Sequence, residues 1–103
     1  MKENIELGDI YFRVHSKEER RLYSLPEYMF FKVYDIDKAR DYAICYEIEK
    51  TKDNKPLDNS YGKNKRFLKI DKETKPGHVL LRDKSKNWSY EKYGDSLNRD
   101  NPE

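Results

Sequence analysis

The stretch Tyr28–Lys50 most constrains the fold, because it holds two apolar runs separated by a short charged segment at 37–40. Side chains of a β-strand point alternately to its two faces, so residues two apart share a face. In the second run, every second residue from Tyr42 to Ile48 is apolar. Apolar recurrence at every second residue favours strands over a helix. The stretch therefore predicts a β-hairpin with a four- or five-residue loop.

The first run of this hairpin differs from the second because large apolar side chains fall on both of its faces. Tyr28 and Phe30 lie on one face, and Met29, Phe31 and Val33 lie on the other. A strand that is apolar on both sides is typical of a position covered from two directions. We therefore expect this run to be a central strand and the hairpin to nucleate the core.

The segments before the hairpin predict one strand and one short helix. Residues 10–14 alternate as a strand would, after a turn signal at Gly8. Ser16 and Glu19 have the spacing of a capping box, which favours a helix beginning there and ending before Pro26. Leu22 and Leu25 would then face the core.

After the hairpin, the sequence predicts a long exposed loop at 50–64 and a second hairpin made of 65–70 and 77–82, turning at 71–76. A short sixth strand at 88–90 would close the sheet. The fold class expected is mainly β: a small antiparallel sheet or barrel of five to six strands, SH3-like or OB-like, with one short helix. The alternative is an α+β arrangement with the helix packed on an open sheet.

The composition and the placement of apolar residues predict the bounds of the domain and its cellular location. Charged residues make up 41% of the 103 residues, and apolar residues gather at 7–14, 22–48 and 67–81. This distribution predicts one small domain at 1–93 and a disordered tail at 94–103. No segment approaches the ~20 apolar residues of a membrane span, and no signal peptide is evident. We therefore expect a cytoplasmic protein without a membrane partner.

Signatures of catalysis and metal binding are missing from the sequence. The single cysteine, Cys45, excludes an internal disulfide and a multi-cysteine zinc site, and a buried core position is its expected place. His15 and His78 have no metal-ligand spacing, and no nucleophile elbow, Walker lysine or Rossmann glycine run occurs. We expect no enzymatic activity, no catalytic residues, no cofactor and no metal.

The start of the first predicted strand, Gly8-Asp9-Ile10-Tyr11, is similar to the first strand of ribonuclease toxins from toxin–antitoxin modules. In that family a glycine-rich segment containing Arg-Pro follows. Here the segment Val14–Arg21 is charged and contains no glycine. The chain is therefore not assigned to that family.

The first functional hypothesis is a protein-binding module. Trp88, Tyr90 and Tyr93 stand in otherwise polar sequence, and Tyr, Trp and Arg are over-represented at binding hot spots. The competing interpretation is that these rings cover the open end of the barrel. A small domain without chemistry suggests docking on a larger protein or nucleoprotein complex. A sharper form is a phage- or mobile-element-encoded inhibitor of a host defence nuclease.

The alternative hypothesis is a barrel that binds single-stranded RNA or DNA. Residues 1–49 carry a net charge of −3 (8 basic, 11 acidic) and residues 50–103 carry +5 (14 basic, 9 acidic). Lysines and aromatic rings on a small barrel suit phosphate contact and base stacking. The competing interpretation is a solvated lysine-rich loop, because the whole chain is barely basic. The candidate residues are Lys52, Lys55, Tyr61, Lys63, Lys65, Arg66 and Lys69.

Overall fold

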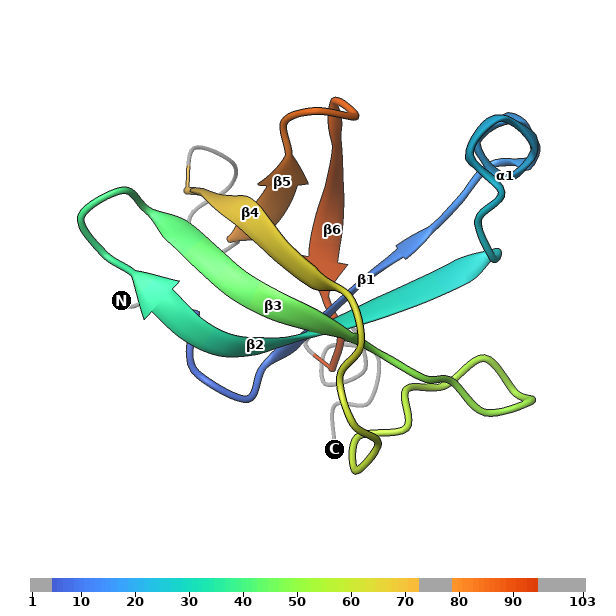
Figure 1. Cartoon of the computed structure of the whole chain (residues 1–103), viewed down its shortest axis with the longest axis horizontal. Coiled ribbons are helices and arrows are strands. Elements are labelled where there is room, and N and C mark those ends of the chain that lie inside the picture. Colours follow the sequence, from blue (N-terminus) through green and yellow to red (C-terminus); the bar gives the residue numbers. More distant parts are fainter. Residues whose placement is uncertain (1–4, 73–78, 95–103) are drawn as a thin grey trace, which may run out of the picture.

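The chain folds into a closed, six-stranded antiparallel β-barrel with one short helix, as the sequence predicts (Figure 1). The computed structural model describes residues 5–72 and 79–94. The elements, in chain order, are β1 (Ile10–Val14), α1 (Lys17–Tyr23), β2 (Tyr28–Asp37), β3 (Tyr42–Ile48), β4 (Lys65–Asp71), β5 (Leu80–Asp83) and β6 (Trp88–Lys92).

Each strand of the barrel pairs with the next in sequence, and the pairing of β6 with β1 is the one non-local pairing among the strands described. The β2–β3 hairpin is joined by the four residues 38–41, within the loop length expected from sequence. The barrel closes where β6 returns to β1, through the two pairs Tyr11–Lys92 and Phe12–Glu91. The β2–β3 ladder has seven pairs, so the closing seam is much the shorter of the two.

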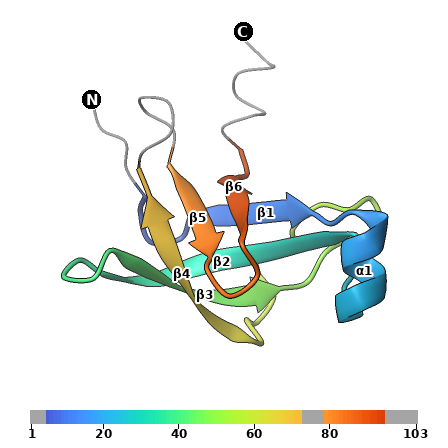
Figure 2. The ribbon, with the colours of Figure 1, turned by 90° about the horizontal axis from the view of Figure 1, so that it is seen from above.

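Helix α1 begins with the predicted capping box: the Ser16 hydroxyl accepts from the Glu19 amide, and the Glu19 carboxylate accepts from the Ser16 amide. The helix lies at one end of the barrel, away from the β2–β3 turn (Figure 2). It buries no residue, and Leu22 is 59% exposed, so the prediction that Leu22 faces the core is wrong. The helix ends after seven residues, and Ser24 turns the chain in a left-handed conformation. Leu25 then packs against the core as expected.

Strand β2 is buried on both faces over its first half, which confirms the prediction of a strand covered from two sides. Phe31 is fully buried inside the barrel. Phe30 points outward and is 1% exposed, because Phe12 stacks on it at 5.9 Å and Tyr93 meets it edge-on at 5.6 Å. A small second cluster therefore covers the outside of the barrel at this point.

Strict alternation fails in the second half of β2, where a β-bulge lies between Val33 and Asp35. A bulge adds one residue to one strand, so side chains beyond it change faces. Unbroken alternation would place Ile36 on the face of Phe30, but Ile36 packs against the interior core instead. The bulge leaves Tyr34 and Asp35 exposed on the outside.

The remaining predicted elements agree with the structure wherever it describes them. Residues 49–64 form an irregular connection apart from one isolated bridge, and β6 includes the predicted strand 88–90. Strand β5 begins at Leu80, within the predicted 77–82. Residues 77–78, most of the turn at 71–76, and the tail beyond Gly94 lie outside the described residues.

Candidate functional site

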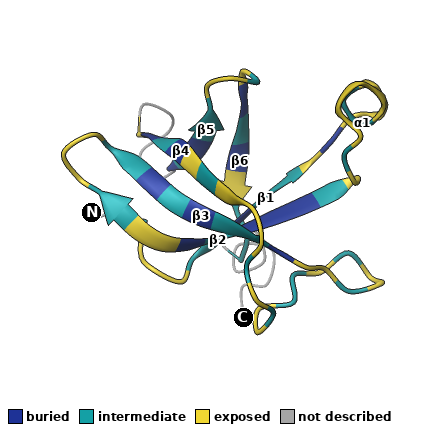
Figure 3. Cartoon of the chain, in the orientation of Figure 1, coloured by how far each residue is buried: buried dark blue, intermediate teal, exposed yellow. Residues whose placement is uncertain are grey.

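The outer side of β2, β3 and β4 is the candidate site. The barrel interior takes only Ala43 and Cys45 from the middle of β3, and both are fully buried. Tyr42, Ile44 and Tyr46 alternate with them, face outward and are half-buried, whereas Ile48 farther along the same side is buried. Figure 3 shows buried bands along β3 beside exposed bands on β2 and β4. We call this surface the β2–β4 face; it consists of Lys32, Tyr34, Asp35, Asp37, Tyr42, Ile44, Tyr46, Lys65, Phe67 and Lys69.

Aromatic rings and lysines interleave across the β2–β4 face. The strand register places Tyr42 beside Lys69 and Tyr46 beside Lys65. The ammonium of Lys69 lies 5.4 Å from the centre of the Tyr42 ring, and that of Lys65 lies 5.6 Å from the Phe67 ring. These distances fall within the range of cation–π attraction. Lys69 also donates a hydrogen bond to the Arg40 carbonyl at 3.1 Å, whereas Lys65 is exposed to solvent.

The two most exposed aromatic side chains of the face lie on its flanking strands. Phe67 on β4 is 58% exposed, and Tyr34 on β2 is 45% exposed. The Tyr34 ring meets the Tyr46 ring edge-on at 5.0 Å, so its position is fixed by a neighbour. Large apolar side chains that are held in place yet exposed are typical of binding surfaces.

Charge is divided between the two sides of the face. On β2, Asp35 is exposed and Asp37 pairs with Arg40 at 3.1 Å. On β4, Lys65 and Lys69 carry positive charge. The register places Asp37 and Lys69 on opposite sides of Tyr42. Lys32 also lies on the outward side of β2, beside Tyr46, and pairs with Asp58 at 3.0 Å. The face therefore carries both signs of charge along β2, is apolar along β3 and is basic along β4.

The three aromatic residues that the sequence singled out near the C-terminus lie elsewhere. Trp88 and Tyr90 are buried inside the barrel, and burial raises the pKa of the Tyr90 phenol to about 12. Tyr93 is half-buried and covers Phe30. The competing interpretation puts these rings over the open end of the barrel. In the structure Trp88 and Tyr90 belong to the interior core, and Tyr93 packs on the outside against Phe30. We leave the three residues out of the candidate site.

The basic residues predicted to bind nucleic acid do not share one surface. Lys65 and Lys69 belong to the β2–β4 face, whereas Arg66 alternates to the other side of β4. Lys63 pairs with Glu49 at 3.0 Å. The remaining candidates are exposed on the connection between β3 and β4: Lys52, Lys55 and Tyr61.

The connection between β3 and β4 is held against the barrel at its second half. The Lys63 amide donates to the Glu47 carbonyl at 2.8 Å, and the Glu47 amide donates to the Asn64 carbonyl at 3.1 Å. Gly62 lies flat on Tyr46: a Cβ added at Gly62 would sit 2.3 Å from the Tyr46 Cβ. Tyr61 is 90% exposed on this anchored segment, so nearly all of its side chain is in contact with solvent.

A polar network ties β1, α1 and β6 together at the opposite end of the barrel. Arg13 donates to the Glu19 carboxylate at 2.7 Å and to the Ser89 carbonyl at 3.1 Å, and its guanidinium lies over the Trp88 ring. Buried His15 also contacts Glu19, at 3.0 Å. The hydrogen bond from Arg13 lowers the pKa of Glu19 to about 2; partial burial opposes this shift, and His15 and the Ser16 amide reinforce it.

Cys45 lies in the core, as expected. Burial raises the pKa of its thiol to about 12, so the group stays protonated near neutral pH. A nucleophilic cysteine acts as the thiolate and needs access to substrate. Among residues 5–72 and 79–94, no cluster of histidine, cysteine and carboxylate side chains has the arrangement of a metal site.

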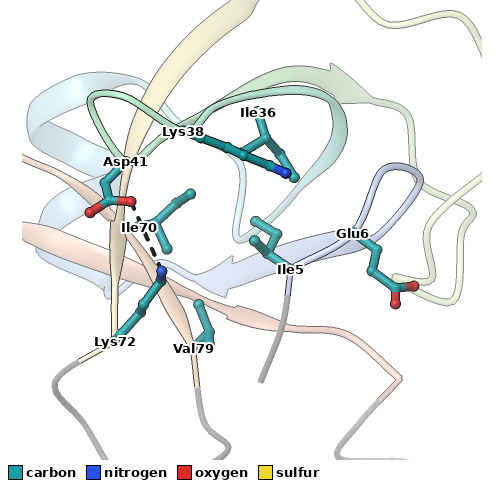
Figure 4. A pocket seen from close by; sticks show the side chains of 8 residues that line it. All are labelled: Ile5, Glu6, Ile36, Lys38, Asp41, Ile70, Lys72 and Val79. Atoms are coloured by element: carbon teal, nitrogen blue, oxygen red, sulfur yellow. Dashed lines mark ion pairs between the residues drawn. The ribbon is translucent and has the colours of Figure 1, made fainter. Parts of the chain in front are cut away.

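A cleft of about 440 Å³ lies at the end of the barrel near the β2–β3 turn (Figure 4). Ile36, Ile70 and Val79 contribute apolar walls, and Lys72 approaches Asp41 at 3.9 Å. Lys72 and Val79 border a range that the structure does not describe, and so does Ile5 on another side. The described part of the wall is incomplete, so we assign the cleft no ligand.

Sequence reasoning missed the centre of the site, namely Tyr34, Tyr42, Ile44 and Tyr46. Alternation in the sequence identifies the apolar face of β3, but it does not by itself say whether this face points into the barrel or out of it. One signal was present: the opposite face offered Ala43 and Cys45, which are small enough for the interior of a narrow barrel.

Comparison with models of protein families, with curated proteins and with solved structures finds no match for this chain. Within the described ranges, no helix has the length and hydrophobicity needed to cross a lipid bilayer.

Proposed function

We propose that the protein is a non-enzymatic binding protein that acts through protein–protein contact at its β2–β4 face. One observation carries the proposal: β3 turns its continuous apolar side outward and gives the interior only Ala43 and Cys45. Burial of apolar surface is worth roughly 25 cal/mol per Å². Leaving this strand face half-exposed forgoes that stabilisation, and a partner that covers the face would recover it.

The layout of the face favours a protein over a nucleic acid. Protein interfaces combine an apolar, aromatic centre with a polar rim. The exposed carboxylate of Asp35 on this face would repel phosphates, whereas it suits a protein partner with a basic group. The cations expected to follow a nucleic-acid strand diverge instead, because Arg66 and Lys65 lie on opposite sides of β4.

The wider setting of this proposal rests on the sequence alone. A larger protein or nucleoprotein complex in the cytoplasm is the partner we propose, and inhibition of a defence nuclease by a mobile-element product is its sharpest form.

Site-specific photo-crosslinking tests the proposal. A photoreactive phenylalanine analogue replaces Phe67 in the full chain, which is made in the cells that naturally produce it. The matched control carries the analogue at Leu22 on α1, because the two side chains are 58% and 59% exposed. Irradiated adducts are then separated with and without nuclease and identified by mass spectrometry.

We expect a nuclease-resistant adduct to a different protein from position 67 and none from position 22. An adduct that disappears with nuclease would establish the nucleic-acid alternative instead. Equal labelling from both positions, or adducts to no other protein from position 67, would refute the proposal. Circular dichroism of both variants confirms that the barrel is intact.

A further inference from the structure

We infer that the protein partner of the β2–β4 face presents two carboxylates to β4, one on either side of an apolar side chain. This inference rests on the proposed function, because it specifies the chemistry of the partner at the same surface. Three features of β3 and β4 support it: the order of their cross-strand pairs, the charges that have no ion partner, and the distance between those charges.

Strands β3 and β4 run side by side (Figure 1), and their outward residues form three successive cross-strand pairs. The central pair joins Ile44 to Phe67, and both of these side chains are apolar. The two outer pairs each join a tyrosine to a lysine, and they are Tyr42–Lys69 and Tyr46–Lys65. An apolar centre therefore lies between two ends that each carry a positive charge.

Lys65 and Lys69 are the two cations of the face that pair with no carboxylate of the described residues. Lys32, the third cation of the face, pairs with Asp58 at 3.0 Å. Lys69 donates to a backbone carbonyl, and Lys65 lies over an aromatic ring. Neither contact supplies a negative charge, so both ammonium groups keep a net positive charge at the surface.

The carboxylates near Lys69 are engaged by other cations. Asp41 and Asp71 line the same hollow as Lys69. Asp41 approaches Lys72 at 3.9 Å, and Asp71 pairs with Arg82 at 3.2 Å. A carboxylate that neutralises Lys69 would therefore come from a partner.

The spacing of the two lysines sets the spacing of the partner's carboxylates. Lys65 and Lys69 are four residues apart on one strand, so their Cα atoms lie about 13 Å apart. An extended segment with acidic residues four positions apart has the same spacing, and its middle residue points to the same side as the two acids. That middle side chain would lie over Ile44 and Phe67. Lysine ammonium and tyrosine phenol groups both donate hydrogen bonds to a carboxylate.

Two separated carboxylates fit these three pairs better than a nucleic acid does. A nucleic-acid strand carries a negative charge at every nucleotide. It would therefore place phosphates over the apolar centre at Ile44 and Phe67 as well as over the two basic ends. An acidic protein segment instead leaves this centre to an apolar side chain.

Peptide titrations of the full chain, followed by two-dimensional NMR, test the inference. The acidic probe is a blocked five-residue peptide with glutamate at both ends, leucine at the centre and threonine between. The comparison probes are the same peptide with lysine at both ends and a five-nucleotide oligothymidylate. The charge-reversed variant combines Lys65→Glu with Lys69→Glu. Its matched control combines Lys52→Glu with Lys55→Glu, which makes the same change in net charge on the exposed connection between β3 and β4.

We expect the acidic peptide to bind wild type with a dissociation constant on the order of 1 mM and to shift the amide signals around Ile44 and Phe67. The lysine peptide should bind at least about fivefold more weakly, because like charges at the surface oppose association. The reversal at positions 65 and 69 should weaken binding of the acidic peptide by at least about the same factor, and the control reversal should leave it unchanged. Thermal melts check that both variants remain folded.

No binding of the acidic peptide up to about 10 mM would overturn the inference. Equal binding of the two peptides, equal weakening by the two reversals, or tighter binding of the oligothymidylate to the same residues would overturn it as well. The proposed function stands after the first three outcomes if position 67 still crosslinks to a different protein. Conversely, binding of the acidic peptide as expected, with no such adduct from position 67, would refute the proposed function and leave the preference of the face for carboxylates in place.

Discussion

Glu19 joins three parts of the structure through one carboxylate. Its two oxygens accept hydrogen bonds from Arg13 and the Ser16 amide, and one of them also contacts the buried His15 ring. The same side chain therefore caps α1 and fixes the end of β1. Charge-assisted hydrogen bonds of this kind are stronger than neutral ones, so the ionised state of Glu19 contributes to folding.

Replacing Glu19 with Gln should make stability less dependent on pH. The pKa of Glu19 lies near 2 in the folded protein against an ordinary value of 4.5, so its carboxylate stabilises the fold above pH 4.5 and loses this effect as pH falls toward 2. We expect Glu19→Gln to cost about 1–2 kcal/mol at pH 7, a figure reduced for the partial exposure of the ion pair.

Urea unfolding of both proteins between pH 7 and pH 2.5 measures this difference. The gap between wild type and Glu19→Gln should narrow steadily below pH 4.5. A gap that stays constant with pH would show that the amide loses packing or capping alone, with no contribution from charge.

Gly62 is a second residue whose type is explained by a contact, here the close approach of its backbone to Tyr46. Its backbone lies against the Tyr46 side chain, and a methyl group there would overlap the Tyr46 Cβ and Cγ. Because both neighbours are close to the main chain, neither has a flexible end that could yield. We expect Gly62→Ala to displace the segment and cost about 1–3 kcal/mol in the free energy of unfolding.

Gly8 provides the control for this substitution. It has a positive φ of 93° but open space around its Cβ position. Gly8→Ala should therefore cost only the backbone strain, about 1–2 kcal/mol, and should leave residues 60–64 unchanged. Two-dimensional NMR should show shifts around Tyr46 for Gly62→Ala alone, and their absence would contradict the close contact.

At the scale of elements, the strands could be predicted because apolar alternation and turn residues mark them locally. Their facing could not be predicted, because alternation defines two faces without saying which is inside. On β3 the larger side chains lie outside, contrary to the usual preference for burying them. On β2 the bulge at Tyr34 shifts the alternation of side chains between the two faces by one residue. No residue in the sequence indicates that a bulge occurs there. The centre of the candidate site lies on these two strands.

Two neighbouring residues on β4 should differ in how much they contribute to the stability of the fold. Leu68 is buried in the barrel, so Leu68→Ala should cost about 2–5 kcal/mol through the cavity it leaves. Phe67 is mostly exposed, so Phe67→Ser should change stability by less than about 1 kcal/mol. Chemical denaturation measures both values. A large loss of stability for Phe67→Ser would show that its ring serves the fold, which would weaken its assignment to a binding surface.

At the scale of the whole molecule, consecutive hairpins were expected and are observed, whereas closure into a barrel stood beside an open sheet as an alternative. Closure depends on β1 and β6, which are far apart in sequence and meet through only two pairs. Such non-local pairing leaves no local pattern to detect. Beyond these pairs, Arg13 bridges the strands by donating to the Ser89 carbonyl.

The short seam predicts where the barrel opens first. Backbone amides of the seam residues Glu91 and Lys92 should exchange with deuterium at least about tenfold faster than those in the β2–β3 ladder, because local opening breaks few bonds there. Arg13→Ala should accelerate this exchange further. Hydrogen-exchange NMR tests both statements, and uniform protection around the barrel would contradict them.

The bulge at Tyr34 has a consequence for how this chain tolerates change over time. Because it shifts the phase of β2, loss or gain of one residue there would exchange interior and exterior positions in the rest of the strand. We therefore expect insertions and deletions in β2 to disrupt the barrel, whereas exposed side chains on its outward side, such as Tyr34 and Asp35, can be replaced one at a time. Related proteins would then change what they bind through single substitutions at exposed outward positions, while the length of β2 stays the same.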